Sequence, residues 1–304
     1  MNTANGTNRS GEPVLEVRDL SIDYLSETTV HAVKGVSLNV ARGEVVGLAG
    51  ESGCGKSTLA YGLTRLLRPP AVVTGGSATF YDRDTGALDL LALSGRQLRT
   101  FRWDKIAMVF QGAMNSLNPV ISIERQLADV FLDHRPELSR HQRRERCAEL
   151  LERVGVARAR LRSYPHELSG GMRQRVMIAM ALALDPQVMI MDEPTTALDV
   201  LVQREILEEI TRLRDQLGFA VIFITHDLPL LLEISDRIAV MRSGEIVECQ
   251  SAYTLYTQPR HEYTKQLLAS FPSLTGERGD FLRKGLSGSL LTDAPGGVQA
   301  DEHA

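Results

Sequence analysis

Short apolar runs alternate with longer segments in which apolar residues recur at helical spacing, and this alternation extends over most of the chain. Four of the apolar runs have the length of a buried strand and end at polar residues or glycine. They are Val45–Ala49, Ile106–Phe110, Val188–Met191 and Ala220–Thr225. Strands that alternate with helices in this way favour an α/β fold with a mainly parallel sheet.

Each of the four predicted strands is followed directly by residues that can carry chemistry. The first leads into a glycine-rich loop with Lys56, the second into Gln111, the third into Asp192 and Glu193, and the fourth into His226. Ligands of open α/β sheets bind outside the carboxyl ends of the strands. We therefore expect these side chains to converge on one site.

The helical patterns suggest how the rest of the chain is organised. Gln203–Leu217 places its apolar residues on one face, and Gly218 is expected to end that helix. Leu138–Arg162 is predicted to be helical with an Arg-rich, solvated face, and a nucleic-acid surface is the alternative. Residues 112–180 carry few strand signals, which predicts a helical subdomain inserted between strands of the core. Residues 1–12 and 285–304 lack periodicity and are expected to be flexible ends.

Composition narrows the class of protein. An apolar fraction of 43% in 304 residues can bury a sizeable core, and a net charge of −4 excludes nucleic-acid binding by bulk charge. The chain has three cysteines, too few for a disulfide framework, and no apolar stretch approaches the roughly 18 residues of a membrane helix. The polar start lacks the apolar segment of a signal peptide. We therefore expect a soluble, intracellular chain whose membrane role, if any, requires a partner.

The segment from Gly50 to Ser57 matches the phosphate-loop pattern G-x-x-x-x-G-K-[ST], with a strand before it and a helical segment, Thr58–Leu67, after it. Glycines let consecutive N–H groups point at phosphate oxygens, and the helix start adds its positive end. Lys56 is expected to reach the β- and γ-phosphates and the Ser57 hydroxyl to hold Mg²⁺. The predicted phosphate-binding residues are Gly50, Glu51, Ser52, Gly53, Cys54, Gly55, Lys56, Ser57 and Thr58.

Two adjacent carboxylates follow the third strand. Asp192 is expected to belong to the Mg²⁺ shell, as in other proteins with a phosphate loop. Glu193 is expected to orient or deprotonate the attacking water. An exposed acidic turn or a helix cap is the alternative, and the phosphate loop upstream disfavours it.

A third motif, Leu168-Ser-Gly-Gly-Met-Arg-Gln-Arg175, precedes another apolar helix. It resembles the signature motif of ATP-binding cassette (ABC) proteins, and the other cassette motifs occur along the chain in the same order as in that family. Gln111 resembles the Q-loop glutamine, Ala197-Leu198-Asp199 the D-loop, and His226 the switch histidine. Tyr24 is similar in position to the aromatic residue that stacks on adenine. A loop or a helix cap is the alternative for the signature segment taken alone.

The resemblance narrows to the oligopeptide, dipeptide and nickel importer subfamily. Phe110–Pro119, Tyr164–Arg175 and Asp192–Asp199 resemble its motifs, and Pro259–Leu267 resembles its C-terminal extension. Many members bind an iron–sulfur cluster with cysteines that follow this extension. No cysteine follows Cys249 here, so we predict no such cluster.

The resemblance implies a P-loop NTPase core with an antiparallel β region near the N-terminus. It implies a nucleotide-binding domain over residues 13–252 and a C-terminal extension over 253–284. It also assigns roles to side chains. Glu193, His226 and Gln111 are expected to be catalytic, and Ser57, Gln111 and Asp192 to hold the metal. Ser169, Gly170, Gly171 and Gln174 are expected to contact ATP bound to a partner cassette, with Asp199 in the D-loop beside them.

In this family two cassettes enclose two ATP molecules head to tail, and hydrolysis reopens the pair. The resemblance therefore implies a second ATPase subunit, for which we expect a different chain, with a homodimer as the alternative. It also implies two transmembrane permease subunits, contacted by Gly112–Arg125, and an extracytoplasmic solute-binding protein. The chain is then expected at the cytoplasmic face of the membrane, with ATP and Mg²⁺ as cofactors and no nucleic acid as a partner.

Other functions stay open from the sequence. Peptides lead as the imported solute, with oligosaccharides and nickel or other metal chelates behind them. A soluble ABC ATPase acting on ribosomes or DNA is disfavoured, because such proteins usually have two cassettes or a long coiled coil. A small-molecule kinase would need neither the signature segment nor His226.

Overall fold

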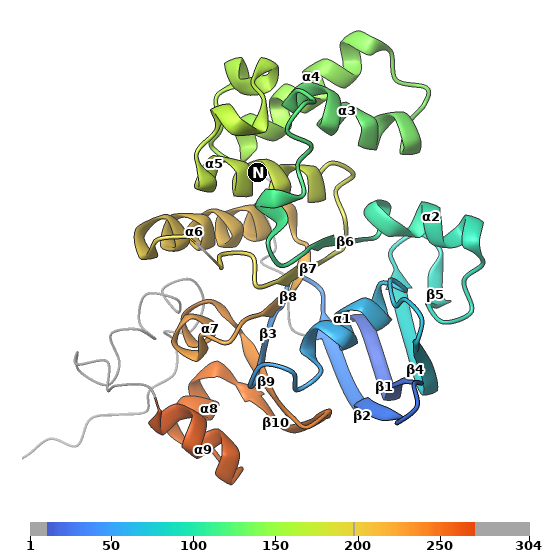
Figure 1. The fold of residues 1–304 in the computed structure, drawn as a ribbon, viewed down its shortest axis with the longest axis vertical. Helices are drawn as coiled ribbons and strands as arrows, with labels where there is room; N and C mark the ends of the chain where they lie inside the picture. Colours follow the sequence, from blue (N-terminus) through green and yellow to red (C-terminus); the bar gives the residue numbers. More distant parts are fainter. Residues whose placement is uncertain (1–10, 197, 271–304) are drawn as a thin grey trace, which may run out of the picture.

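The computed structural model describes residues 11–196 and 198–270, and Figure 1 shows their arrangement. The predictions for residues 1–10, for Ala197 of the D-loop, for 271–284 of the extension and for the 285–304 tail lie outside these residues. The described part contains two sheets and the helices that connect and cover their strands (Figure 1).

The larger sheet has six strands in the order β10-β9-β3-β8-β7-β6. All neighbouring pairs are parallel except the last hairpin, in which β10 runs antiparallel to β9. Its strands are β3 Val45–Ala49, β6 Ile106–Val109, β7 Val188–Asp192, β8 Ala220–Ile224, β9 Arg237–Arg242 and β10 Glu245–Ser251. The prediction of an α/β fold with a mainly parallel sheet is confirmed, and all four predicted strands belong to it.

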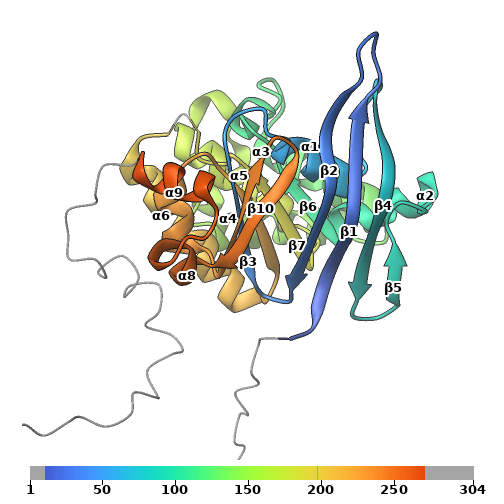
Figure 2. The ribbon, with the colours of Figure 1, turned by 90° about the horizontal axis from the view of Figure 1, so that it is seen from below.

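The smaller sheet is antiparallel, with the order β2-β1-β4-β5. Its strands are β1 Pro13–Tyr24, β2 Val30–Ala41, β4 Ala71–Asp82 and β5 Gly86–Asp89. Figure 2 shows this sheet standing beside the parallel one, with helix α1 (Lys56–Leu63) between them. The expected antiparallel region near the N-terminus is thereby confirmed.

The described chain between β6 and β7 contains helices and short 3₁₀ turns but no strand. Its helices are α3 Ile123–His134, α4 Arg140–Arg153 and α5 Gly170–Ala181, which gather above the parallel sheet in Figure 1. The 3₁₀ turns span Ala113–Asn115, Arg158–Arg162 and Pro165–Glu167. Helix α2, Gly95–Asp104, precedes β6. The chain between β6 and β7 is the inserted helical subdomain that the sequence predicts.

Two predicted helices are shorter than expected. The helix predicted over Leu138–Arg162 ends at Arg153, because Gly155 adopts a left-handed conformation with φ 69°. The helix predicted over Thr58–Leu67 ends at Leu63, and Arg65 has φ 54° shortly after it. The helix predicted over Gln203–Leu217 is longer at its start, Val200–Leu217 (α6), and ends at Gly218 as expected.

Two hydrophobic cores lie on the two faces of the parallel sheet. One packs helices α3 to α7 against it and the other packs α1 and the antiparallel sheet against it. Strand β3 serves both, since Val45 and Ala49 belong to the first core and Val46 and Leu48 to the second. Burial on both faces explains why the strands read as continuous apolar runs.

The remaining helices follow the sheet strands: α7 Leu228–Ile234 after β8, then α8 Ala252–Thr257 and α9 Glu262–Ala269 after β10. Both short terminal helices lie at the β10 edge of the sheet (Figure 1). Within residues 11–196 and 198–270, no helix combines the length and the apolar composition needed to cross a membrane.

Candidate nucleotide-binding site

The four strands that precede the candidate residues are neighbours in the parallel sheet, in the order β3-β8-β7-β6. Because all four run in the same direction, their carboxyl ends form one edge. The phosphate loop, His226, the Asp192–Glu193 pair and Gln111 all start from this edge. The structure therefore brings together the residues that the sequence predicts to converge.

The phosphate loop has glycine where no other residue fits. Gly50 and Gly55 have φ of 146° and 108°. A Cβ atom at Gly50 would lie 2.2 Å from the carbonyl oxygen of Met241, and one at Gly55 would lie 2.3 Å from that of Ala32. Both neighbours are backbone atoms that cannot move aside, so these positions require glycine.

Lys56 begins helix α1, yet its side chain turns back into the loop. Its ammonium donates hydrogen bonds of 2.8 Å to the carbonyl oxygens of both Gly50 and Glu51. The side chain is only 6% exposed, and the Cys54 sulfur lies 3.7 Å from the ammonium. A buried cation held by neutral carbonyl oxygens is well suited to bind an anion that enters the loop.

Asp192 closes the loop from the side of β7. The Ser57 hydroxyl donates to its Oδ1 at 3.1 Å. The carboxylate is 1% exposed, and its Oδ2 has no hydrogen-bond partner among the described residues. Burial raises the pKa of the Asp192 carboxyl, and the charge of Glu193 adds to this rise. A buried, half-paired carboxylate beside a hydroxyl is a donor set that suits a hard cation such as Mg²⁺.

Glu193 lies at the centre of a hydrogen-bonded group. Its Oε2 accepts from Gln111 Nε2 at 2.9 Å and from the Thr196 hydroxyl at 3.1 Å. Its Oε1 lies 3.2 Å from Nδ1 of His226. The backbone of Glu193 has φ 46°, a strained value for this residue type, and its N–H donates to the carbonyl of Ile224. Glu193 is thus in direct contact with the other two residues predicted to be catalytic, Gln111 and His226, and also with Thr196.

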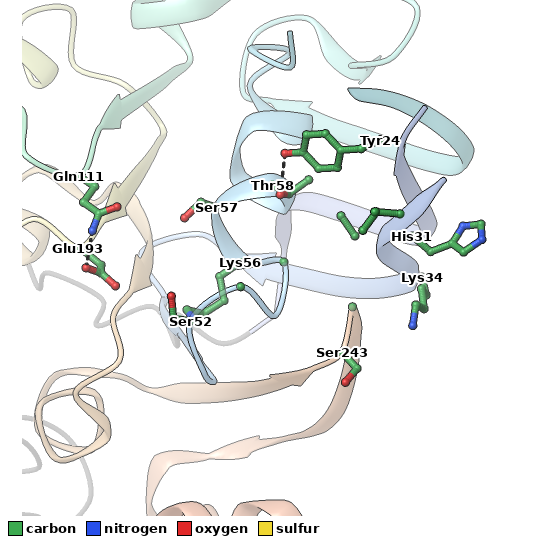
Figure 3. A pocket seen from close by; sticks show the side chains of 15 residues that line it. Tyr24, His31, Lys34, Ser52, Lys56, Ser57, Thr58, Gln111, Glu193 and Ser243 are labelled. Atoms are coloured by element: carbon green, nitrogen blue, oxygen red, sulfur yellow. Dashed lines mark hydrogen bonds between the residues drawn. The ribbon is translucent and has the colours of Figure 1, made fainter. Parts of the chain in front are cut away.

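A pocket of about 420 Å³ opens beside these residues (Figure 3). Tyr24 lies on its wall, and its hydroxyl is 3.2 Å from that of Thr58. Gln111 and Glu193 face the pocket from one end, and Tyr24 stands at the other (Figure 3). The described residues that line it are Tyr24, Val30, His31, Ala32, Lys34, Ser52, Gly53, Gly55, Lys56, Ser57, Thr58, Gln111, Glu193, Ser243 and Gly244.

Several lining residues were not predicted from the sequence. His31 and Lys34 come from β2, and Ser243 and Gly244 from the turn between β9 and β10. None of them carries a motif, and their position depends on how β2 and the hairpin pack on the loop. Two backbone hydrogen bonds make that connection: the N–H of Lys34 donates to Gly244, and the N–H of Gly244 donates to Cys54.

The signature segment lies elsewhere. Ser169 is exposed and caps helix α5, accepting a hydrogen bond from the N–H of Met172 at 3.3 Å. A Cβ atom at Gly171 would lie 2.6 Å from Cγ1 of Val202, so this glycine lets α5 approach α6 closely. No described residue of the segment lines the pocket. Asp199 likewise caps a helix, since its Oδ1 accepts from the N–H of Val202 at 3.0 Å.

Gln174 is the exception among the expected signature contacts. Its side chain is 1% exposed and points into the protein, because the residue falls on the buried face of α5. The expected contacts of Ser169, Gly170, Gly171 and Gln174 with nucleotide on a partner stay predictions, and for Gln174 the contact would require its buried side chain to become accessible.

Comparisons of the sequence and of the structure with known proteins point to the same protein family. The model of the ABC transporter family matches residues 33–196. The chain is 46% identical over 270 residues to the probable peptide ABC transporter ATP-binding protein y4tR of Sinorhizobium fredii, covering 88% of this chain and 79% of that protein. It is 42% identical over 265 residues to the oligopeptide transport ATP-binding protein OppD of Bacillus subtilis, covering 86% and 72% respectively.

Among solved structures, the fold is similar to a dimeric, post-hydrolysis state of the ATP-binding cassette MJ0796 bound to ADP and Pi. The TM-score is 0.67 at 29% identity, with 78% of this chain and 98% of that chain covered. The family match spans more than half of the sequence and contains the phosphate loop, the signature segment and the Asp192–Glu193 pair. The chain therefore belongs to the ABC transporter family and is one of its ATPases.

Proposed function

We propose that the chain is the ATP-hydrolysing subunit of an importer for dipeptides or oligopeptides. The observation that carries the hydrolytic part is the contact of Glu193 with Gln111, Thr196 and His226 beside the Lys56 loop. The proposal of a peptide solute rests on the similarity to the peptide and oligopeptide transport proteins named above.

The geometry supports a division of labour for hydrolysis. The phosphate loop and Lys56 bind the phosphates, and Tyr24 offers an aromatic face for the base. Glu193 takes a proton from the attacking water, and His226 and Gln111 hold the carboxylate and the γ-phosphate in line. Glu193 can be held this firmly because its carboxylate is bonded from both oxygens.

Ser57 and Asp192 are the residues that would hold Mg²⁺, together with the amide oxygen of Gln111. The Oδ2 of Asp192 is buried without a partner among the described residues, and the amide nitrogen of Gln111 is already committed to Glu193. A bound Mg²⁺ neutralises charge on the β- and γ-phosphates.

Two chains are needed for a complete site in this proposal. Ser169, Gly170 and Gly171 lie at the start of α5, away from the pocket lining, and present backbone N–H groups at a helix start. A second cassette facing head to tail would bring such a segment to the γ-phosphate. We propose a different chain as that second cassette, with a homodimer as the alternative.

The proposed membrane contact is the segment 112–125 that follows Gln111. Val120 is 78% exposed there and Phe110 is 36% exposed, whereas Leu117 is buried in the core and packs inward. These two exposed apolar side chains flank Gln111 on either side in the sequence, so a permease that contacts them can move the residue that lines the pocket. We propose two permease subunits, attachment at the cytoplasmic face of the membrane, and a solute-binding protein on the other side.

The experiment is a pull-down of the chain from detergent-solubilised native membranes, followed by mass spectrometry. Recovery of multispanning permeases and of a second cassette supports the transporter and heterodimer proposals. Recovery of ribosomes or nucleic-acid-binding proteins alone would contradict them. The co-purifying solute-binding protein is then titrated with dipeptides, oligopeptides, oligosaccharides and nickel chelates, and only peptide binding supports a peptide solute.

A further inference from the structure

Helix α9, in the C-terminal extension, contacts the phosphate loop directly. The N–H of Glu51 donates a hydrogen bond of 3.1 Å to the phenol oxygen of Tyr263. Tyr263 is the second residue of α9, and its side chain is 4% exposed. A buried phenol oxygen aimed at one backbone N–H is a specific contact between two segments far apart in the sequence.

Glu51 is a sensitive position in the loop. Its carbonyl oxygen accepts from the Lys56 ammonium at 2.8 Å, while its N–H donates to Tyr263. The two groups of this residue therefore join α9 on one side to the phosphate-binding lysine on the other. If the Tyr263 hydroxyl is displaced, the backbone of Glu51 loses a hydrogen bond, and this backbone provides one of the two carbonyl oxygens that bind the Lys56 ammonium.

The start of α9 is itself fixed by the parallel sheet. The Glu248 carboxylate, on β10, is 7% exposed and accepts hydrogen bonds from the N–H groups of Arg260 and His261 at 2.8 and 2.9 Å. Nδ1 of His261 then accepts from the N–H of Tyr263 at 3.1 Å. Three successive contacts thus place the Tyr263 ring relative to the edge strand of the sheet.

The same ring also packs on the turn that lines the pocket. The guanidinium carbon of Arg242 lies 4.9 Å from the centre of the Tyr263 ring. Arg242 ends β9, and the next residues, Ser243 and Gly244, line the pocket. Tyr263 therefore supports the pocket from two sides: the phosphate loop and the β9–β10 turn.

We propose that Tyr263 is a positioning residue for ATP binding, and that it couples occupancy of the pocket to the order of α9. The proposal rests on the assignment of the pocket as the nucleotide site. Coupling between two sites is reciprocal. If the docked Tyr263 hydroxyl favours ATP binding, bound ATP must in turn favour the docked hydroxyl, and therefore the ordered form of α9. The C-terminal extension would thus act on the ATP site of its own chain.

The test compares two tyrosines of the C-terminal extension. Tyr263→Phe keeps the ring on Arg242 and removes only the oxygen that accepts from Glu51. Tyr253→Phe, on α8, is the matched control, because that side chain is 56% exposed and no hydrogen bond of its hydroxyl occurs among the described residues. ATP affinity is measured by equilibrium titration, and KM and kcat by phosphate release.

We expect Tyr263→Phe to weaken ATP binding and raise KM by about 3- to 10-fold, the range of one net hydrogen bond. The kcat at saturating ATP stays within about twofold of wild type, since ATP restores the loop once bound. Tyr253→Phe leaves all three values unchanged. An ATP affinity of Tyr263→Phe equal to that of wild type would overturn the proposal.

Hydrogen exchange separates positioning from a merely structural role. In the wild type, ATP should slow amide exchange in residues 262–269, and in Tyr263→Phe this effect of ATP should largely disappear. Equal protection of α9 by ATP in both proteins contradicts the coupling. A variant that only destabilises the fold would instead exchange faster throughout, with or without ATP.

Lys56→Ala distinguishes failure of this proposal from failure of the site assignment. If Lys56→Ala binds ATP like the wild type, the pocket is not the nucleotide site and the premise is wrong. If Lys56→Ala loses ATP while Tyr263→Phe binds normally, the site holds and only the role of Tyr263 is wrong.

Discussion

The phosphate-loop pocket and the signature segment are both built around glycine at the start of a helix, but the chain completes only one of them. At the pocket, Lys56 is held by two carbonyl oxygens, and Ser57 is bonded to Asp192. At the signature segment, Ser169 bonds only to its own helix. Its glycine Gly171 is explained by packing against α6 rather than by a ligand.

This difference has a physical meaning for binding. A site whose donors are already fixed by contacts within the chain loses little entropy when a phosphate enters. An exposed helix start offers N–H groups but no charge and no enclosing wall, so alone it binds weakly. We therefore expect the first region to bind nucleotide in a single chain, and the second to bind phosphate only when another surface carries it.

The largest expected effect concerns Glu193, which belongs to the completed region. Glu193→Gln keeps the size of the side chain but removes the base, so ATP hydrolysis should fall by about 10²- to 10⁴-fold. ATP affinity should remain within about threefold, because Glu193 acts on water rather than on the phosphates. Phosphate release and equilibrium ATP binding measure the two effects.

Glu208→Gln serves as its control, because Glu208 is exposed on α6 and lies outside the pocket. Hydrolysis by Glu193→Gln at the wild-type rate would remove Glu193 from the catalytic role.

The second largest effect tests how much Lys56 contributes to the affinity of the pocket for ATP. Lys56→Ala removes a buried cation that we expect to bind the phosphates, so ATP affinity should fall by about 100-fold. Lys265→Ala is the control, since that ammonium is exposed and paired with Glu262. Fluorescence titration with a nucleotide analogue measures both. Similar affinities of the two variants would mean that the phosphates bind elsewhere.

The third effect is smaller and addresses the signature segment. Ser169→Ala removes a helix cap, which costs about 1 kcal/mol of stability. We expect ATP binding by the single chain to be unchanged and ATP-driven association and hydrolysis to fall by about tenfold. Analytical ultracentrifugation with ATP, in the Glu193→Gln background, measures the association.

Ser139→Ala is a closely matched control, because Ser139 caps α4 with the same geometry, accepting from the N–H of Gln142 at 3.3 Å. It should lose the same stability and keep association. If both variants associate equally well, the signature segment has no role beyond capping its helix.

The sequence predicts the fold well where burial on both faces forces a continuous apolar run. All four runs are strands of the parallel sheet, and Gly218 ends α6 as expected. It predicts helix lengths less well, because the ends at Arg153 and Leu63 depend on single residues, Gly155 and Arg65, with positive φ. Gly155 is the same kind of helix-ending signal as Gly218 and could have been used in the same way. Nothing in the sequence marks Arg65, because an arginine rarely adopts a positive φ.

The site shows the same limit. Residues that follow strands in sequence, such as Gln111 and Glu193, could be placed because parallel strands share an edge. His31 and Tyr263 could not, since each reaches the site through packing between distant segments. Thr196 is different, because it lies three residues after Glu193 in the same loop, and no motif pointed to its hydroxyl. The burial of Gln174 could not be foreseen either, because sequence proximity to Ser169 does not reveal which face of α5 is buried.

The smallest expected effect is a change in thermal stability. It tests whether the buried Asp192 carboxylate of the phosphate-loop pocket destabilises the fold when no Mg²⁺ is bound. Burial raises the pKa of the Asp192 carboxyl, so the folded state disfavours its charge. A raised folded-state pKa means that the stability from the neutral form is present at low pH and is lost as pH rises through that pKa.

At pH 7 without Mg²⁺, Asp192→Asn should therefore raise Tm by about 2 °C. The gain should shrink as the pH is lowered, because the wild-type carboxyl then becomes neutral too, and Asp133→Asn, on the exposed face of α3, should leave Tm unchanged. Differential scanning calorimetry over pH 5 to 7 measures the effect. If the Tm of Asp192→Asn at pH 7 is at or below that of the wild type, the Asp192 carboxylate has a stabilising partner in the folded chain. The polar groups of the pocket would then be paired within the chain as fully as those at the capped start of α5.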